Sequence, residues 1–415
     1  MKILFLSRWF PYPPDNGSKL RISNLIRQLA AEHEVFLVSF RPPERIIEPA
    51  AEQAAASVCA TVDTAPYHGY RSAGIKALLG LLAPRPRSLV AAHSPEFAAQ
   101  MARRLREHRC DLVVASELDM LPYALAQRDA PILLDDLELG VYRDGLSQNR
   151  SVPARLRAWL TWFKLGNYLR RELPRVAACT VVSEQERETV RMIAPAYSRV
   201  SVVPNAVDVA SYAGCHAEPQ PNTLIFSGAL SYRANYDGLR WFLAEVFPRV
   251  QRAVPDVRLR VTGSTQSIDL AGLPASSAVE YTGYVDDIRP VVAESWVAVV
   301  PLLHGSGTRL KILEAMALGT PVVSTSKGAE GLAATPGDDI ILHDDPDGFA
   351  RGVVDLLRSS ELRRRLAEGG RRLVQDRYDW QVVGAHVRAL AQSASGRSGS
   401  ESGVHQVRWQ TAEHG

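Results

Sequence analysis

The densest group of residues able to carry chemistry lies between positions 301 and 324, where an apolar run leads into a turn of small residues and then into good helix formers. Gly305 to Thr308 form the turn, and Arg309, Lys311 and Glu314 open the helix. Glycine lets the backbone approach a ligand closely, and a helix N-terminus presents N–H groups and partial positive charge to it. The helix dipole disfavours cations such as Arg309 and Lys311 in the first turn, and a bound anion would explain their placement there. We therefore predict an anion site, with Glu314 in reach of neighbouring hydroxyl groups, as a nucleotide sugar offers.

The same segment also fits an ordinary strand, turn and helix with a solvated basic end, and the residues alone favour neither interpretation. Two further carboxylate groups are weaker candidates. Asp345 and Asp347 have the spacing of a metal-binding pair but stand in a loop before a helix, and we predict no metal site there. Asp135, Asp136 and Glu138 follow a strand and could meet a ligand hydroxyl, although a turn or N-cap role is the more frequent one.

Apolar runs along the chain indicate the scaffold that must position these residues. Short apolar strands alternate with amphipathic helical segments, which is the pattern of a parallel sheet covered by helices. Strands are expected at residues 2–7, 34–40, 111–115, 131–135, 179–183 and 199–203, and then at 224–228, 257–263, 279–283, 295–301 and 320–326. Parallel sheets bind ligands at the carboxyl ends of their strands, so two facing sheets would place a site in the cleft between them.

The chain is therefore predicted to be an α/β protein with two doubly wound domains. The first covers residues 1–204 and the second residues 205–392, with a last helix at 380–392 able to pack back on the first domain. Residues 393–415 are rich in Ser, Gly, Arg and Glu, and we expect a disordered tail there.

Composition narrows the class of protein. A length of 415 residues allows two or more domains, and an apolar fraction of 46% supports a large core. The 48 basic and 45 acidic residues leave a net charge of +3, which does not indicate a nucleic acid partner. Four scattered cysteines favour a reducing, cytoplasmic compartment over a disulfide framework. We expect neither a secretory signal nor a membrane span, since no apolar run reaches roughly 20 residues.

The sequence resembles the retaining glycosyltransferases of family 4, of the type found in bacterial envelope-polysaccharide assembly. The resemblance is carried by GSGTRLKILEAMALGTPVVSTSKGAEGL, FPYPPDNGSKLRISNLIRQLAAEHEV, VVSEQE with VSVVPNAVD, LIFSGALSYRANYDGLRWF and VEYTGYVDDIRPVVAESWVAVVPL. It spans residues 1 to about 390. It implies the GT-B fold, in which two Rossmann-like domains face each other, the first binding the acceptor and the second the nucleotide-sugar donor.

The resemblance also implies roles for individual residues. Glu314 matches the second Glu of the family's Glu-x7-Glu motif, which holds the ribose of the donor. Ser306 stands where the first Glu would be. The contact of that Glu with the transferred sugar would then come from backbone N–H groups of Ser306, Gly307 and Thr308.

The pyrophosphate would be bound by Arg309 and Lys311, as in relatives with the same G-S-G-T-R-x-K variant, with Arg233 a weaker candidate. With Glu314 these two cations are the residues to which the resemblance assigns catalysis. Three loops would supply the other donor contacts, through Gly17, Gly228, Gly283, Tyr284 and Val285.

The activity implied is transfer of a sugar from a UDP-, GDP- or dTDP-linked donor to a glycan or lipid-linked acceptor with retention of configuration. No metal or other cofactor and no nucleophilic side chain is implied. Two alternatives stay open. One is a GT-B sugar-nucleotide epimerase, and the other is a catalytically inactive nucleotide-sugar-binding subunit, suggested by Ser306.

A basic and aromatic segment runs from Arg150 to Arg175. Seven basic residues and one acid are interleaved there with Trp, Phe, Tyr and Leu side chains. Such a helix suits an anionic membrane surface, which would make the protein peripheral at the inner face of the cell membrane. A core helix with a solvated basic edge fits the pattern equally well.

Overall fold

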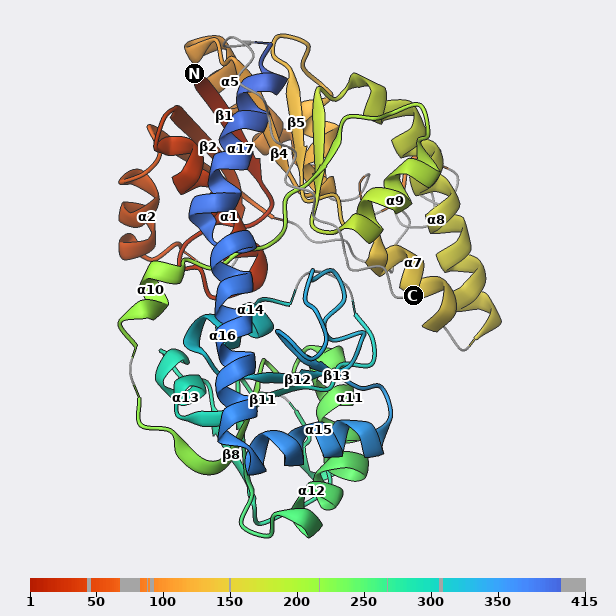
Figure 1. Cartoon of the computed structure of the whole chain (residues 1–415). Coiled ribbons are helices and arrows are strands. Elements are labelled where there is room, and N and C mark those ends of the chain that lie inside the picture. The colour runs from red at the N-terminus through yellow and green to blue at the C-terminus, as the bar shows by residue number, and fades with distance from the viewer. Residues whose placement is uncertain are drawn as a thin grey trace. The chain divides into compact units, whose positions relative to one another are not determined.

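A computed structural model of the chain describes residues 1–396 except 43–45, 68–82, 88, 90–92, 149–150, 216, 267 and 306–308. The described chain forms two compact units, each with its own parallel sheet. The first unit contains Met1–Pro204 and the described chain from Val383, and the second contains Asn205–Val382 (Figure 1). The chain therefore passes between the units twice.

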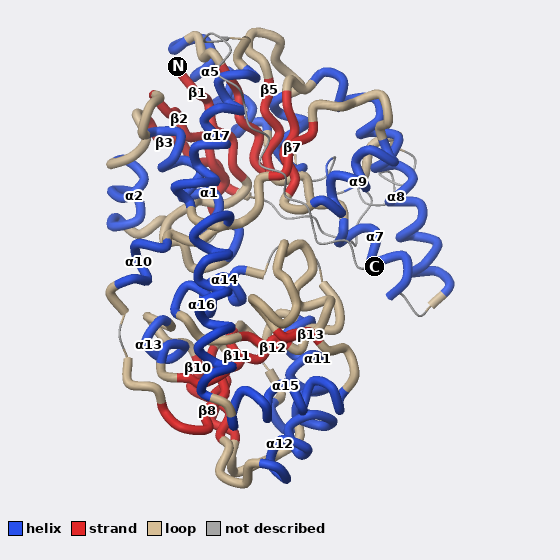
Figure 2. The backbone as a smooth tube through the Cα atoms, in the orientation of Figure 1, coloured by secondary structure: helices blue, strands red, loops and turns tan. Residues whose placement is uncertain are grey.

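Seven parallel strands form the sheet of the first unit, in the order β3-β2-β1-β4-β5-β6-β7 (Figure 2). They are β1 (Lys2–Ser7), β2 (Glu34–Arg41), β3 (Thr61–Pro66), β4 (Leu112–Ser116), β5 (Ile132–Asp135), β6 (Ala178–Val181) and β7 (Val200–Val202). The helices are α1 (Gly17–Ala30), α2 (Pro49–Ala56), α5 (Pro95–His108), α6 (Leu121–Ala124), α7 (Gly140–Gln148), α8 (Val152–Glu172) and α9 (Glu184–Ile193).

Six parallel strands form the sheet of the second unit, in the order β10-β9-β8-β11-β12-β13. They are β8 (Gln220–Ser227), β9 (Arg258–Thr262), β10 (Val279–Gly283), β11 (Ser295–Val300), β12 (Val322–Ser324) and β13 (Ile341–Leu342). The helices are α10 (Val209–Ala213), α11 (Arg233–Trp241), a π-helical turn (Phe242–Val246), α12 (Phe247–Ala253), α13 (Arg289–Ala293), α14 (Leu310–Leu318), α15 (Pro346–Arg358) and α16 (Ser360–Arg377). The last helix, α17 (Trp380–Ala394), begins in this unit and continues into the first.

Strand order reverses at the first strand of each sheet, between β1 and β4 and between β8 and β11. This is the Rossmann-like topology, and it confirms the predicted class of two doubly wound α/β sheets. Each reversal leaves a crevice at the carboxyl ends of the two strands beside it.

Two edge strands, β3 and β13, were not predicted from the sequence. Only Ala65 is buried in β3, so this strand lacks the apolar run that marks the central strands. The carboxylate of Asp63 instead pairs with Arg103 and Arg104 of α5. Strand β13 is two residues long, which is too short to show a pattern.

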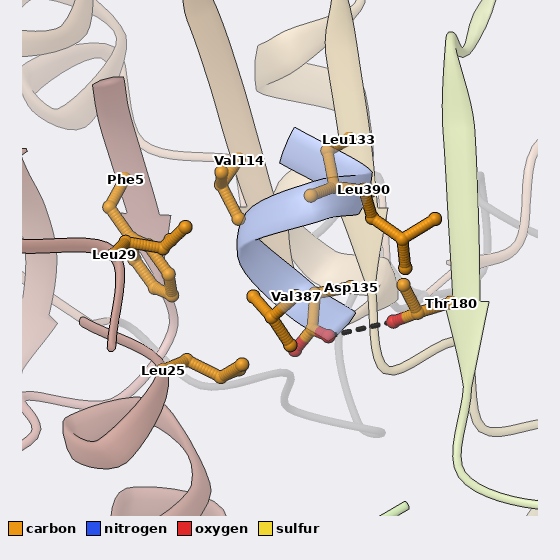
Figure 3. Close-up of a pocket in the computed structure, with 9 residues that line it drawn as sticks. All are labelled: Phe5, Leu25, Leu29, Val114, Leu133, Asp135, Thr180, Val387 and Leu390. Atoms are coloured by element: carbon orange, nitrogen blue, oxygen red, sulfur yellow. Dashed lines mark hydrogen bonds between the residues drawn. The ribbon is translucent and has the colours of Figure 1, made fainter. Parts of the chain in front are cut away.

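A buried ion pair joins the helix α1 to the middle of the first sheet. Arg21 and Asp135 are 2% and 3% exposed, and the guanidinium donates to the Asp135 carboxylate at 2.8 and 3.2 Å. Arg21 also donates to the Val203 carbonyl at 3.0 Å, and the Thr180 hydroxyl donates to Asp135 at 2.7 Å. In Figure 3 Asp135 and Thr180 lie among apolar side chains. Asp135 is therefore committed to the core, which corrects the interpretation of this residue as a ligand contact.

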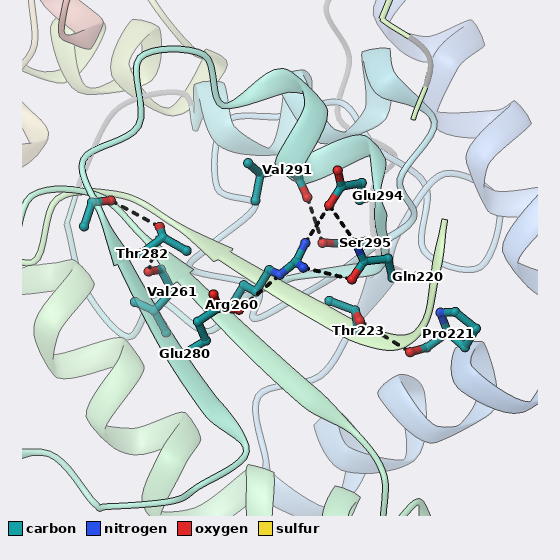
Figure 4. Close-up of polar contacts among 11 residues, drawn as sticks. Gln220, Pro221, Thr223, Arg260, Val261, Glu280, Thr282, Val291, Glu294 and Ser295 are labelled. Atoms are coloured by element: carbon teal, nitrogen blue, oxygen red, sulfur yellow. Dashed lines mark hydrogen bonds and ion pairs between the residues drawn. The ribbon is translucent and has the colours of Figure 1, made fainter. Parts of the chain in front are cut away.

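A second polar network lies in the second unit, at the start of its strands (Figure 4). Arg260 of β9 donates to Glu294 at 2.7 Å, to Gln220 at 2.8 Å and to Glu280 at 3.3 Å. It thereby ties β8, β9 and β10 together at the edge opposite the strand carboxyl ends. The network has a structural role and leaves the other edge for ligands.

The last described helix, α17, packs on the first unit from Val383 onward. Val387 and Leu390 lie beside Leu25 and Leu133 (Figure 3). Arg388 contacts Gln28 at 2.6 Å and Glu32 at 2.8 Å. The helix ends at Ala394, two residues later than predicted, and residues 397–415 of the predicted tail lie outside the described residues.

Among the described helices, none is both long enough and apolar enough to cross a bilayer.

Replacing Arg21 should destabilise the first unit strongly. In Arg21→Met the Asp135 carboxylate stays buried without its cation, and we expect a loss of about 3–5 kcal/mol in the free energy of unfolding. Urea denaturation followed by circular dichroism measures it. Arg27→Met, on the exposed side of the same helix, should have little effect. Equal midpoints for the two variants would contradict this role of the ion pair.

Candidate functional site

The candidate site lies in the second unit, where the sheet order reverses between β8 and β11. The segment after β8 begins at Gly228 and leads into α11, and the segment after β11 leads from Pro301 into α14. Residues Ser306, Gly307 and Thr308 of the predicted turn lie outside the described residues. Two cations and one carboxylate from the segment after β11 lie here, together with glycines at the carboxyl ends of β8, β9 and β10.

Lys311 is the central cation. Its ammonium Nζ donates to Oδ1 of Asn235 at 2.9 Å and lies 5.0 Å from the centre of the Phe226 ring. Burial, together with the charge of Arg309, lowers the pKa of Lys311 to about 7, while the charge of Glu314 opposes that shift. An amide oxygen does not compensate for the lost hydration of an ammonium, whereas an anion would.

Glycines make the space in which this ammonium lies. Gly228 has φ +140°, and a Cβ there would stand 2.7 Å from Nζ of Lys311. A Cβ on Gly263 would stand 2.4 Å from the Gly228 carbonyl oxygen. Gly263 in turn donates its N–H to the Gly283 carbonyl at 2.9 Å. The carboxyl ends of β8, β9 and β10 thus carry glycines, and a ligand can approach their backbone.

Arg309 is the second cation and the N-cap residue of α14. It is 8% exposed. A Cβ on Gly305 would stand 3.0 Å from its Nη2 and 2.9 Å from the Tyr232 hydroxyl. The guanidinium therefore lies against Gly305, the first residue of the predicted turn.

Glu314 is the carboxylate of the group, one helical turn beyond Lys311. Its Oε1 accepts a hydrogen bond from the Tyr212 hydroxyl at 3.3 Å. Burial raises the pKa of Glu314, while the Tyr212 hydroxyl and the Lys311 charge oppose that rise. Tyr212 belongs to α10, which Arg289 holds by donating to the Ser211 carbonyl at 2.6 Å. The carboxylate is thus oriented by a neighbouring helix.

Other residues named from the sequence lie at different places. Arg233 is 82% exposed and pairs with Asp237 at 2.8 Å, and the same carboxylate lies 3.0 Å from Nε2 of His304. Gly283, Tyr284 and Val285 follow at the end of β10, with Tyr284 exposed. Gly17 is the first residue of α1 in the other unit.

The Asp345 and Asp347 carboxylates have separate partners. Asp345 caps α15 by accepting from the Gly348 N–H at 2.7 Å, and Asp347 pairs with Arg249 at 2.7 Å. Their spacing is therefore explained by a helix start. Within the part of the chain that the structure describes, no three His, Cys, Asp or Glu residues are grouped as a metal site requires.

Sequence reasoning missed three residues that touch the site: Asn235, Tyr232 and Tyr212. Asn235 contacts Lys311 across 76 positions of the chain, and Tyr212 contacts Glu314 across 102. The polar start of α11, directly after a glycine loop, was the available signal for Asn235 and Tyr232. Nothing in the local pattern around Tyr212 marks it.

Two family models match the chain. The model of Glycosyltransferase Family 4 matches residues 16–211, and the model of Glycosyl transferases group 1 matches residues 221–359. Together they cover both units and include Lys311 and Glu314.

A curated relative is the phosphatidyl-myo-inositol mannosyltransferase of Mycolicibacterium smegmatis, 30% identical over 209 residues, which are 47% of this chain and 52% of the relative. The chain spans about half the length of the curated relatives it matches. The solved sucrose-phosphate synthase of Thermosynechococcus elongatus has a TM-score of 0.68 at 17% identity, covering 96% of this chain and 100% of that one. Anabaena HepE in complex with UDP has a TM-score of 0.66 at 15% identity, covering 95% and 100%.

Replacing Lys311 by an apolar residue should stabilise the second unit in a pH-dependent way. The folded state lowers the pKa from 10.5 to about 7, so the unfolded chain binds more protons in that window and stability rises with pH there. Lys311→Met removes this cost, and we expect a gain of about 4 kcal/mol near pH 7 that shrinks toward pH 10. Denaturation across a pH series measures it. Lys327→Met, a lysine paired with Glu330, serves as the control, and a gain that does not vary with pH would refute the assignment.

Proposed function

The chain belongs to the family 4 glycosyltransferases with the two-domain GT-B fold, and on this basis we propose that it moves a sugar from a nucleotide-sugar donor to a glycan or lipid-linked acceptor with retention of configuration. The observation that carries the proposal is the grouping of three side chains at the start of α14, with Lys311 against Gly228, Arg309 against Gly305 and Glu314 accepting from Tyr212. That arrangement offers two cations to a diphosphate and a carboxylate to the hydroxyl groups beside it.

The donor in this proposal is UDP-, GDP- or dTDP-linked. Support comes from Anabaena HepE, whose solved structures contain UDP and UDP-glucose. Lys311 pairs with a neutral amide in the described structure, and a diphosphate would raise its pKa. Lys311 would therefore take up a proton as the donor binds.

The leaving diphosphate gains negative charge as its bond to the anomeric carbon breaks. Arg309, protonated Lys311 and the N-terminus of α14 would neutralise that charge without reorganising. Glu314, oriented by Tyr212, would hold the ribose hydroxyls. Retention would follow from attack by the acceptor on the face that the diphosphate leaves, so we assign no protein nucleophile. We propose that the reaction needs no metal, since Asp345 and Asp347 are used as a cap and an ion pair.

A lipid-linked acceptor would be reached at a membrane, and we propose that α8 of the first unit makes that contact. Its first half exposes Val152, Leu156, Trp159 and Phe163 on one face, each between 52 and 76% exposed. The Trp159 and Phe163 rings stack at 5.6 Å. Exposed Arg155 and Arg157 lie on the same half of the helix. This combination suits an anionic lipid surface.

The second half of the basic segment is a core helix with a solvated basic edge, which was the alternative interpretation of the sequence. Leu165 and Leu169 are buried, and Arg170 donates to the Ile193 carbonyl. Arg171 and Arg175 both pair with Glu172. We therefore limit the proposed membrane contact to residues 152–163, and Arg150 lies outside the described residues.

Nucleotide binding tests the donor site. Calorimetric titration with UDP, GDP and dTDP should find one preferred nucleotide, and Glu314→Ala should weaken its binding by about 1–3 kcal/mol. At a pH about one unit above the Lys311 pKa, binding should take up a proton, detected as a dependence of the enthalpy on the buffer, and Lys311→Met should abolish this uptake.

Turnover of the donor tests the catalytic role of Arg309. Arg309→Ala should lower kcat about 10²-fold, and EDTA should have no effect on the wild type.

Arg240→Gln, on the exposed side of α11, is the matched control for these variants. Binding of no nucleotide, or unchanged affinity in both Glu314→Ala and Lys311→Met, would refute the donor site. Turnover that stops on addition of EDTA would refute the metal-free mechanism.

Vesicle binding tests the α8 contact. Co-sedimentation with phosphatidylglycerol vesicles should weaken as salt rises, because each exposed Arg contributes about 1 kcal/mol at most through a screened interaction. The double variant Trp159→Ser/Phe163→Ser should lose the salt-resistant remainder. Met192→Ser replaces an exposed apolar residue of α9 and should bind as the wild type does. The contact is disproved by equal binding of all three proteins, or by equal binding to phosphatidylcholine vesicles.

A further inference from the structure

Helix α10 is joined to two other helices of the second unit, α13 and α14, through polar contacts. The Tyr212 hydroxyl donates to Oε1 of Glu314 in α14 at 3.3 Å. The Arg289 guanidinium, at the start of α13, donates to the Ser211 carbonyl at 2.6 Å. Helix α13 follows the loop after β10, which is expected to contact the donor, and α14 carries the carboxylate expected at the ribose. Helix α10 thus connects two parts of the donor site.

Further contacts fix α13 and α14 relative to each other. The Arg289 guanidinium is held by Asp287, whose two carboxylate oxygens accept from Nε and Nη2 at 2.8 Å each. The Thr320 hydroxyl, which follows α14, donates to the Val292 carbonyl of α13 at 2.9 Å. The three helices therefore form a closed set of contacts, which we call the α10 bracket. Helix α10 cannot shift against α14 without breaking one of them.

The contact between Tyr212 and Glu314 orients the carboxylate and uses little of its capacity. Among the described residues, only Tyr212 donates a hydrogen bond to this carboxylate. Burial, together with the charge of Glu314, raises the pKa of Tyr212, so the hydroxyl keeps its proton and serves as a donor. A carboxylate offers about four acceptor positions on its two oxygens. One hydroxyl therefore leaves most of them to donors that a ligand brings.

A fixed carboxylate distinguishes ribose from 2′-deoxyribose. Ribose presents its 2′- and 3′-hydroxyls side by side, and both O–H groups can donate to one carboxylate. A 2′-deoxyribose presents only the 3′-hydroxyl there and leaves one carboxylate oxygen without its donor. A site built to accept a hydroxyl rejects the analogue that lacks it, because the polar group of the site stays unpaired. The rejection requires a carboxylate that cannot turn to another partner, and the Tyr212 contact supplies that restraint.

We propose that the α10 bracket makes the donor site selective for ribonucleotides, with Tyr212 as the positioning residue that holds Glu314 toward both ribose hydroxyls. This inference rests on the proposed function, because it takes Glu314 as the ribose contact. UDP- and GDP-linked donors then bind, whereas dTDP-linked donors, which lack the 2′-hydroxyl, are excluded. Arg289 acts one step further away, by holding the helix that carries Tyr212.

Calorimetric titration of the full chain with matched nucleotides tests the selectivity. The pairs are UDP with dUDP and GDP with dGDP, which differ only in the 2′-hydroxyl. The preferred ribonucleotide should bind the wild type at least about tenfold more tightly than its 2′-deoxy partner. Tyr212→Phe keeps the ring and removes the hydroxyl, and it should reduce this ratio several-fold. Tyr236→Phe removes a hydroxyl of α11 that donates to the Asp269 carbonyl at 3.3 Å, and it should keep the wild-type ratio.

A double variant separates positioning from a general loss of structure. Glu314→Ala should remove the selectivity, and adding Tyr212→Phe to it should leave the ratio unchanged, because Tyr212 acts through Glu314. If Tyr212→Phe does not fold, Arg289→Gln carries the test, and its ratio must fall below that of the wild type.

Three results would overturn the inference. They are equal binding of the two members of a pair by the wild type, a preference for dTDP over UDP and GDP, and an equal weakening of both members of a pair in Tyr212→Phe. A wild type that binds none of these nucleotides would instead refute the proposed donor site, so the two failures are distinguishable.

Discussion

The parallel direction of the strands decides where this protein can do chemistry. In a parallel sheet every strand ends at the same edge, so the loops that follow the strands gather there. Where the strand order reverses, the loops after the two adjacent strands run to opposite sides of the sheet and leave a crevice between them. Both units obey this constraint. Lys311 and Glu314 stand at such an edge in the second unit, and Glu117 and Asp136 stand at the corresponding edge in the first. At the opposite edge of the second sheet, Arg260 instead joins neighbouring strands through hydrogen bonds and ion pairs.

Buried charge is treated differently at the two edges. Arg21 has a carboxylate partner inside the protein, and that pair is complete without any ligand. Lys311 donates to a neutral amide, and the nearby charge of Glu314 offsets only part of the cost of burying its protonated form. Both cations lose hydration on burial. Arg21 recovers the lost stabilisation from Asp135 and has a structural role, whereas Lys311 can recover it from an anionic ligand. Neither outcome depends on residue type alone, since each is decided by the partner that the fold supplies.

Much of the fold could be predicted because its signals are local. Apolar runs indicated eleven of the strands, and the helix after Gly305 was expected from its good helix formers. β3 and β13 were missed because an edge strand held by ion pairs, or one of two residues, leaves no apolar pattern. The contacts of Lys311 with Asn235 and of Glu314 with Tyr212 join distant segments, so only the fold could reveal them. The positive φ of Glu117 and Asp136 likewise had no sequence signal, since neither residue is a glycine.

The helix α17 has a consequence for the order in which the chain can fold. Residues 1–204 emerge from the ribosome long before α17. Yet Val387 of α17 is buried in the core of the first unit, and half-buried Leu390 lies with it beside Leu25 and Leu133. The first unit is therefore discontinuous in sequence, and its apolar face must wait through the synthesis of the whole second unit before it is covered. The nascent first unit is thus the species most exposed to aggregation and to chaperones, and the second unit, which is continuous, can close its core first.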